Sequence, residues 1–241
     1  MRAIGLRRLL LLLAMKISIV IPALNEEAAL GRTVAQVRKT SGLIPTEIIV
    51  VDGKSADRTL AVARETADLA LETAQPGRAA QMHQGALAAS GELLLFLHAD
   101  TMLPDLWQEA LRRAWSGDPK PGATAFRLGF DRGGWWYRFV AKTAHLRMLC
   151  TGVPHGDQAI AVRRESYFRV GGFPPVPLME EYVLMEKLRS CGRVEVLPER
   201  VLTSTRRYDK DGPLWASMRN NLLIALFYLG VAPHRLAKLY R

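Results

Sequence analysis

Cysteine is scarce in this chain of 241 residues. Its two cysteines, Cys150 and Cys191, lack the Cys-x-x-Cys or His/Cys spacing that would hold zinc. Two thiols cannot build a disulfide-rich scaffold, so we expect a reducing, cytoplasmic setting. Long apolar runs are absent too, since the stretches at 9–15 and 222–232 are each too short to span a bilayer. The sequence therefore predicts neither a disulfide framework, nor a zinc module, nor a membrane-spanning helix.

Acidic residues are fewer than basic ones, with 23 Asp and Glu against 33 Lys and Arg, which gives a net charge of +10. Such an excess favours polyanionic partners: phosphates, nucleic acid or an acidic membrane surface. Three of the arginines lie in residues 1–14, which we expect to be a disordered or misannotated leader, and without them the charge is still +7. The composition, 49% hydrophobic and 23% charged, indicates one large globular domain with a smaller extension.

Strand-like and helix-like patterns alternate through the first half of the chain. Strand patterns at 17–22, 46–52, 69–72 and 91–100 are each followed by helical spacing, which predicts an open, mostly parallel sheet with helices on both faces. Further strand candidates at 123–130, 157–162 and 193–198 lie among helices near 134–149 and 180–191. The predicted fold is therefore α/β, a Rossmann-like open mixed sheet flanked by helices, with a helical extension from Pro213.

Polar residues follow three strong strands at the edge where open parallel sheets bind ligands. Each has a structural alternative, because Asn25 and Asp57 could cap helices, Asp52 and Gly53 form a common turn pair, and a lone histidine is more often structural. Taken together they favour a binding site. The residues are Asn25, Glu26 and Glu27; Asp52, Gly53, Ser55 and Asp57; and His98, Asp100 and Thr101.

Five segments in order, IPALNEE, VVDGKSADRT, GRAAQMHQGA, FLHADT and GDQAIAV, resemble glycosyltransferase family 2, whose members have the A-type glycosyltransferase fold. The resemblance covers roughly residues 15–205. It extends to a bacterial subgroup labelled radical-SAM or selenodomain-associated transferases, some named carotenoid-acid glycosyltransferases. It implies an inverting, metal-dependent transfer of a sugar from a nucleotide-diphosphate donor to a hydroxyl or carboxyl acceptor, with lipid-linked and carotenoid acceptors as candidates.

The same resemblance implies a role for each matching position. Asp100 would be the metal-binding end of an Asp-x-Asp motif in which His98 replaces the first Asp, and Mg²⁺ or Mn²⁺ would be the cofactor. Residues 15–120 would bind the nucleotide sugar, 121–205 would form the acceptor side of the same domain, and 206–241 a basic helical extension. Acceptor-side positions are Gly156, Asp157 and Gln158. Donor-binding positions are Pro22, Ala23, Asn25, Glu26, Asp52, Gly53, Ser55, Arg78 and Gln81, with Arg206 and Arg207 closing over the diphosphate.

The candidates for the general base lie in the helix predicted near 180–191. Helical spacing places Glu180 and Glu181 on the flanks of an apolar stripe, with Tyr182 facing away. Acids in a first turn are also stabilised by the helix dipole while staying solvated, so a purely structural role is the alternative. In the family a Glu-Asp pair stands here, and this chain departs from it with Glu-Glu. We hypothesise that Glu181 is the base and keep Glu180 as the second catalytic candidate.

Two surface features have open interpretations. The aromatic cluster at 135–139 contains Trp136, which with Val140 is spaced like a packing face for the core or for a homodimer contact. From Arg200 to the end the chain has eight Lys or Arg and two Asp beside the apolar run 222–232. This combination suggests an interfacial helix on the anionic inner face of the cell membrane. A packed C-terminal helix with a solvated basic face fits equally well.

Three other functions compete with the transferase. A sugar-phosphate nucleotidyltransferase would carry a glycine-rich signature near its N-terminus, which this chain lacks. A nucleic-acid-binding protein would show a helix-turn-helix, RNP or zinc signature, and none is present, so nucleic acid is not the expected partner. A relative that binds nucleotide sugars without transferring them remains an alternative because of the Glu180-Glu181 departure.

Overall fold

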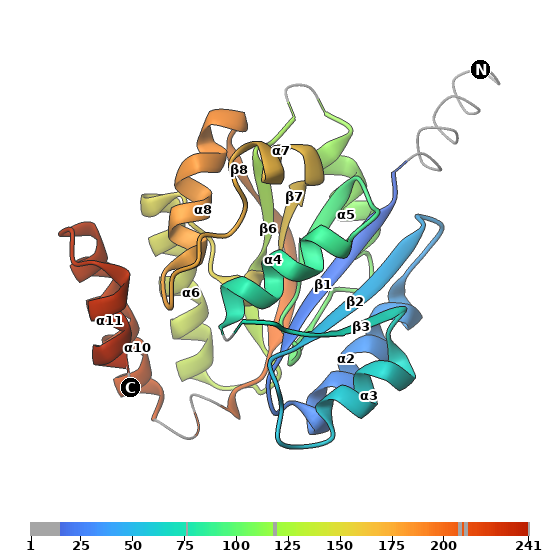
Figure 1. The fold of residues 1–241 in the computed structure, drawn as a ribbon. Coiled ribbons are helices and arrows are strands. Elements are labelled where there is room, and N and C mark those ends of the chain that lie inside the picture. Colours follow the sequence, from blue (N-terminus) through green and yellow to red (C-terminus); the bar gives the residue numbers. More distant parts are fainter. Residues whose placement is uncertain (1–14, 76, 118–119, 207–208, 210–211, 241) are drawn as a thin grey trace.

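A computed structural model describes residues 15–75, 77–117, 120–206, 209 and 212–240. The predicted leader at 1–14 and Arg207 lie outside the described residues. The described strands form one eight-stranded sheet in the order β3-β2-β1-β4-β7-β6-β8-β5 (Figure 1). Their bounds are β1 Ile17–Ala23, β2 Thr46–Asp52, β3 Leu69–Glu72, β4 Leu93–Phe96, β5 Thr101–Met102, β6 Ala123–Phe130, β7 Ile160–Arg163 and β8 Val194–Thr203.

Helices connect these strands and form the C-terminal end of the described chain. The longest are α6 and α10, and two short 3-10 turns, η1 and η2, precede β7 and β8. The bounds are α2 Glu27–Thr40, α3 Thr59–Thr66, α4 Arg78–Ala88, α5 Trp107–Trp115, α6 Trp135–Thr151, η1 Gly156–Gln158, α7 Arg164–Arg169, α8 Glu180–Leu188, η2 Arg189–Cys191, α10 Pro213–Tyr228 and α11 Pro233–Tyr240.

The sheet is mixed, as the sequence predicts. Strands β1 to β4 pair in parallel, and β7 is inserted antiparallel between β4 and β6. Strand β6 pairs in parallel with β8, and the short β5 joins the far edge antiparallel to β8. Because β6 and β4 run in the same direction, the carboxyl ends of β1, β2, β4 and β6 lie along the same edge of the sheet.

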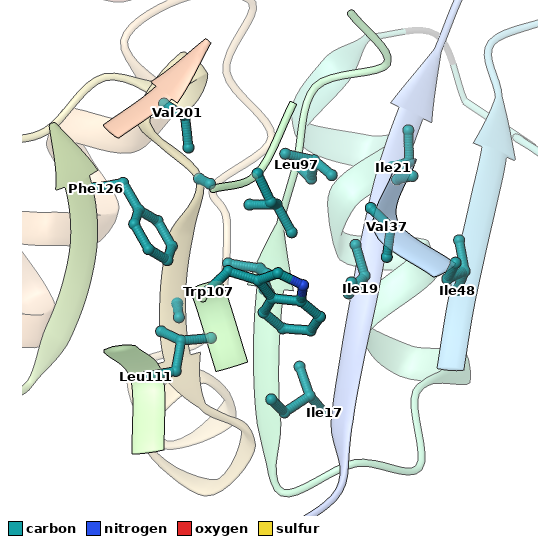
Figure 2. Packing of buried hydrophobic residues seen from close by; sticks show 14 of the residues in the cluster. Ile17, Ile19, Ile21, Val37, Ile48, Leu97, Trp107, Leu111, Phe126 and Val201 are labelled. Carbon is teal, nitrogen blue, oxygen red and sulfur yellow. The ribbon is translucent and has the colours of Figure 1, made fainter. Parts of the chain in front are cut away.

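Apolar side chains from opposite faces of the sheet form two cores. Helices α2, α3 and α5 cover one face, where Trp107 is fully buried among residues that include Ile17, Ile19 and Phe126 (Figure 2). Helices α4, α7, α8, α10 and α11 contribute to the other core. Alternation along β1 sends Ile19 and Ile21 to the first core and Val20 to the second, which is why its run of apolar residues has no polar face.

The predicted strands and helices are found with several differences. Of the strand predicted at 157–162, Asp157 and Gln158 lie in η1 and the strand begins only at Ile160, because Ala159 has a left-handed backbone (φ 50°). The strand expected at 91–100 is regular only over β4, because the residues after Phe96 leave the sheet toward the site. Strand β8 continues past the predicted 193–198 to Thr203 despite Pro198, beside a register irregularity between Phe126 and Arg127 of β6. Strand β5 and helix α7 were not predicted, since two and six residues are too few to give a periodic pattern.

The C-terminal extension is a pair of helices at one side of the molecule (Figure 1). Leu223, Ile224 and Leu236 are buried in the second core, whereas Trp215 and Leu229 are exposed. The extension is therefore packed on the domain along one side and presents apolar side chains on the other. Over the described residues, no helix has the length and apolar character needed to cross a membrane.

Candidate active site

The loops after β1 and β2 are joined by reciprocal hydrogen bonds. Asn25 has a left-handed backbone (φ 55°); its Oδ1 accepts from the amide of Ala56, and its own amide donates to Ser55 Oγ, both at 2.9 Å. One residue on, the amide of Glu26 donates to Thr59 Oγ1 at 2.7 Å. The helix-cap interpretation of Asn25 is therefore wrong, because its side chain holds the neighbouring loop and the first amide of α2, that of Glu27, donates to Asp57 Oδ2 at 3.2 Å instead.

Asp52 anchors this double loop from the end of β2. Its side chain is buried, and it accepts from the hydroxyl of Ser55 at 2.5 Å and from the amide of Ser55 at 2.9 Å. The amide of Gly53 donates to the carbonyl of Ala23 at 2.7 Å, and an added Cβ there would lie 3.0 Å from Gln81 Nε2. The residues predicted around Asp52 are thus brought together, with Asp52 as the group that shapes the loop.

Three of the predicted donor-binding residues form the floor beneath that loop. Pro22 and Ala23 are buried in β1, and Gln81 is buried on α4. The Gln81 amide donates to the carbonyls of Ala23 and Val51, each at 2.8 Å. Gln81 therefore ties the ends of β1 and β2 together, and the structure places its amide against the backbone instead of in the pocket.

Arg78, the first residue of α4, is the centre of the charged cluster. Its Nε donates to Glu180 Oε1 at 2.7 Å, and its Nη2 donates to Glu181 Oε1 at 2.6 Å. Its Nη1 lies 3.2 Å from His98 Nε2. Both glutamates are buried, so the solvated-face alternative for them is wrong. The cluster joins two parts of the chain a hundred residues apart.

Helix α8 begins at Glu180, after Met179 in the left-handed conformation (φ 66°). The two acids thus stand in its first turn, where the helix dipole stabilises negative charge. Tyr182, expected to face away, is buried with them, and its hydroxyl lies 2.7 Å from His155 Nε2. Burial, followed by the charges of Arg147 and Arg78, holds the pKa of His155 well below its usual range.

Burial raises the pKa of Glu181 to about 7, with the Arg78 guanidinium opposing and the Glu180 carboxylate adding to the rise. A carboxyl with such a pKa can exchange a proton near neutral pH, which is the property required of a general base. Glu181 also lines the main cavity of this edge, and Glu180 is not among the lining residues. The two acids therefore differ in their access to a substrate.

Gly156 separates Glu181 from His98. A Cβ built on Gly156 would lie 2.4 Å from Glu181 Oε1 and 2.8 Å from His98 Nε2, so only glycine leaves these side chains in place. Asp157 follows it and also lines the cavity. Gln158 is buried, and its amide donates to the carbonyl of Phe126 while its Oε1 accepts from the amide of His155. Gly156 and Asp157 are thus at the site, and Gln158 supports the turn beneath it.

Asp100 and Arg206 form the opposite side of the site. Arg206 Nη2 donates to both carboxylate oxygens of Glu26, at 2.7 and 2.6 Å, and lies 4.0 Å from Asp100 Oδ2. The Glu26 hydrogen bond raises the pKa of Arg206, which stays a cation. Its side chain is half exposed, so it can change partner without a large rearrangement.

The donor chemistry around Asp100 fits a divalent cation in part. The described residues contain no cluster of three or more His, Cys, Asp or Glu side chains that could hold a metal by themselves. Asp100 lines the cavity with no hydrogen bond to its carboxylate from the described residues, and His98 lines it too. One carboxylate and one imidazole suit Mn²⁺ or Mg²⁺ only if a bound diphosphate and water complete the coordination.

The cavity has a volume of about 340 Å³, and residues of the C-terminal helices close one side of it. The sequence did not predict that the C-terminal helices would line the cavity, nor that Thr203 and Ser204, at the end of β8, would line it. An amphipathic C-terminal helix was visible in the sequence, but nothing there indicated which cavity it would border. The missed lining residues are His155, Leu178, Met179, Tyr182, Thr203, Ser204, Ala216, Arg219, Asn220, Leu223, Ile224 and Tyr240.

Solved structures share this fold. The glucosyl-3-phosphoglycerate synthase of Mycobacterium tuberculosis, in complex with Mn²⁺ and UDP-glucose, superposes with a TM-score of 0.62 at 21% identity over 90% of this chain and 80% of that one. A mannosyltransferase of Pyrobaculum calidifontis in complex with GDP-mannose and Mn²⁺ gives 0.59 at 21% identity, over 83% and 63% of the two chains. At these identities the likeness establishes the fold, the open sheet flanked by helices expected from the sequence.

Sequence comparison adds a relative and a family. A glucosyl-3-phosphoglycerate synthase of Mycolicibacterium smegmatis is 33% identical over 97 residues, which cover 37% of this chain and 32% of that relative. The alignment thus spans about a third of the relative's length. The model of glycosyl transferase family 2 matches residues 18–172. Because this match runs from β1 past β7 and takes in well over half of the sequence, the chain belongs to glycosyl transferase family 2.

Proposed function

We propose that this glycosyltransferase moves a sugar from a nucleotide-diphosphate donor to a hydroxyl or carboxyl group of an acceptor, with inversion at the sugar carbon. The observation that carries the proposal is the single cavity that Arg78, Asp100 and Glu181 all line. The cationic Arg78 suits a diphosphate, the carboxylate of Asp100 suits a metal ion, and the carboxyl group of Glu181 suits proton transfer. The family supports the reaction class, and the M. tuberculosis and P. calidifontis structures hold nucleotide sugars with Mn²⁺.

The donor would lie across the carboxyl ends of β1, β2 and β4. The loop held by Asp52, Ser55 and Asn25 would form the nucleoside side, because it is fixed by hydrogen bonds before any ligand arrives. Arg78 and Arg206 would face the diphosphate, since guanidinium groups donate bidentately to phosphate oxygens. In this structure each of them is paired with glutamates, so a diphosphate would exchange with carboxylates that already hold the arginines in position.

Asp100, with His98 beside it, would hold Mg²⁺ or Mn²⁺. When bound, the ion supplies a Lewis acid that neutralises charge on the departing nucleoside diphosphate. His98 Nε2 lies 3.2 Å from Arg78, so its part in metal binding requires Arg78 to turn toward the phosphates. Asp100 is therefore the primary ligand in this proposal.

Glu181 would accept the proton of the acceptor. It lines the cavity, its pKa of about 7 suits proton transfer at neutral pH, and Arg78 holds its carboxylate in position until a diphosphate binds. Glu180 would act as the positioning partner, because it shares Arg78 without lining the cavity. In-line displacement places the base on the sugar face opposite the leaving group, and Glu181 and Asp100 approach the cavity from different elements.

The acceptor would have an apolar part. Leu178, Leu223 and Ile224 line the cavity beside Tyr240, on the side away from the donor loops. This wall suits a lipid-linked or carotenoid acceptor, in keeping with the subgroup that the sequence resembles. Exposed Trp215, on the outer side of the C-terminal helices, supports a peripheral contact with an anionic membrane, from which such an acceptor would be drawn.

A thermal-shift screen of UDP- and GDP-sugars with and without Mn²⁺ tests the proposal. A ligand present at 100 times its Kd stabilises the native state by about 2.7 kcal/mol. We expect at least one nucleotide sugar to raise the unfolding temperature in an Mn²⁺-dependent way, and Asp100→Ala to lose that dependence. Asp105→Ala, an exposed neighbour, is the matched control. If no nucleotide sugar stabilises the protein, or if Asp100→Ala keeps the full effect, the proposal is wrong.

A further inference from the structure

A second cavity, of about 350 Å³, lies between strands β6 and β8 and helix α6. It shares no lining residue with the cavity of the candidate active site. Strand β6 and helix α6 lie beside each other (Figure 1), and Arg127 to Phe130 pair with Arg200 to Thr203 of β8. At β8, Leu202 lines this cavity and Thr203 lines the other. Neighbouring residues of β8 therefore border different cavities, and the two cavities are separate.

The walls of this cavity are strongly basic, and no Asp or Glu is among the lining residues. Arg127 and Arg200 come from the strands, and Arg138 and Lys142 come from α6 one turn apart. Arg132, at the rim, forms an ion pair with Asp209 at 3.3 Å, and Asp209 itself does not line the cavity. The other four cations have no ion pair to any described residue. Such a concentration of positive charge costs free energy unless an anion occupies the cavity.

Two buried nitrogen atoms of the lining also lack a partner. Arg127 Nε and His145 Nδ1 are both shielded from solvent and make no hydrogen bond within the described residues. Buried polar groups in proteins are nearly always hydrogen-bonded. These two nitrogen atoms are therefore available to bond a ligand that reaches the cavity. Phosphate oxygens match this set, since guanidinium and ammonium groups donate strongly to them.

Helix α6 presents an apolar stripe on the same face as two of the cavity's basic residues. Trp135, Phe139, Leu146 and Leu149 are between 51% and 71% exposed. At 100° per residue these four fall on one face of α6, where Lys142 lies among them and Arg138 lies at the edge of the same face. A surface with exposed aromatic and leucine side chains next to a basic pocket matches an amphiphile whose head is a phosphate and whose tail is apolar.

We propose that the β6–α6 cavity binds the phosphate headgroup of a membrane lipid while the apolar stripe of α6 enters the interface beside it. This deepens the membrane contact of the proposed function, because it locates a specific headgroup site away from both the donor site and the C-terminal helices. Arg127 and Arg200 would form the base of the site, and Arg138 and Lys142 its outer rim. Binding there leaves the active-site cavity open, because the two cavities share no lining residue.

The test uses sedimentation of the full chain with vesicles of phosphatidylcholine, with or without phosphatidic acid. The pocket variant is Arg138→Gln/Lys142→Gln, and the matched control is Lys39→Gln/Arg64→Gln, which removes two exposed charges from α2 and α3. We expect the wild type to bind only the phosphatidic acid vesicles and the pocket variant to bind about thirtyfold more weakly. The control should stay within about twofold of the wild type.

Several outcomes would overturn the proposal. These are no vesicle binding by the wild type, equal loss in both variants, or no loss in the pocket variant. Stabilisation by inorganic pyrophosphate through Arg138 and Lys142 without vesicle binding would assign the cavity to a free phosphate and exclude the lipid. Nucleotide-sugar stabilisation, measured on the same preparations, should be equal in all three proteins and reports the donor site separately. An unchanged unfolding temperature of the pocket variant shows that it is folded.

Discussion

At the scale of single residues, the proposed function depends on which carboxylate faces the cavity. Glu180 and Glu181 are adjacent, both buried, and both bonded to Arg78, yet Glu181 alone of the two lines the cavity. Two carboxylates sharing one guanidinium cannot both be fully neutralised by it, so one of them holds its proton more tightly. The structure assigns the raised pKa to Glu181.

Stability should therefore depend on pH through Glu181. Its pKa is about 7 in the folded chain against 4.5 ordinarily, so the folded state keeps a proton that the unfolded state has released. Between these values stability falls as pH rises, and above about 7 this contribution is constant. Urea unfolding from pH 5 to 8 should show the wild type losing stability relative to Glu181→Gln up to pH 7. The exposed Glu65→Gln should run parallel to the wild type, and a parallel Glu181→Gln would contradict the assignment.

Gly156 gives a second test at this scale. In Gly156→Ala the new methyl group would meet Glu181 Oε1 at 2.4 Å and His98 Nε2 at 2.8 Å, so both side chains must move, Glu181 by about 1 Å. A displacement of that size costs about 100-fold in kcat/KM. The unfolding temperature should change little, because flexible side-chain ends can give way. Gly117→Ala, whose nearest atom is 3.6 Å away, is the control and should keep full activity. Full activity of Gly156→Ala would show that the geometry of this pair is not needed.

At the scale of elements, the loops after β1 and β2 behave as one unit. Ser55 connects them, since it donates twice to buried Asp52 and accepts from the amide of Asn25. Removing its hydroxyl leaves a buried carboxylate oxygen without its donor, which costs about 1–3 kcal/mol. Ser55→Ala should lower the free energy of urea unfolding by that amount and weaken nucleotide-sugar binding. Ser190→Ala, on the exposed turn η2, should change it by less than about 0.5 kcal/mol. An unchanged Ser55→Ala would show that the loops are held by other contacts.

The elements were also the part of the structure best predicted from the sequence. The β-branched run at β1 and the alternation of strands with helices follow from local periodicity, and the structure confirms them. The partners of these elements were harder to predict. Nothing near Arg78 in the sequence indicates Glu180 and Glu181, and the helical projection that placed Tyr182 outside failed because α10 covers that side. Gln81 was predicted among the donor-binding residues, but its amide donates to the carbonyls of two strands.

At the scale of the whole molecule, a single sheet joins the two predicted halves. Strands β1, β2 and β4 supply the loops proposed to bind the donor, and α8, from the second half, supplies both acids of the charged cluster. The basic residues behind the charge of +10 lie in different parts of the molecule. Arg78 and Arg206 are paired with acids at the candidate active site, whereas four cations without an ion pair to a described residue line the β6–α6 cavity. The basic excess thus fits the two phosphate-bearing ligands that we propose for two separate cavities.

The central claim is that the cavity carries out sugar transfer with Glu181 as the base, and acceptor-independent hydrolysis tests it most directly. The substrate is the nucleotide sugar that stabilises the protein most strongly with Mn²⁺, and water takes the place of the acceptor. The account predicts slow turnover by the wild type, a loss of about 100-fold or more in Glu181→Gln with donor binding retained, and a smaller loss in Glu180→Gln. Full turnover by Glu181→Gln with an inactive Glu180→Gln would contradict it and transfer the role to Glu180.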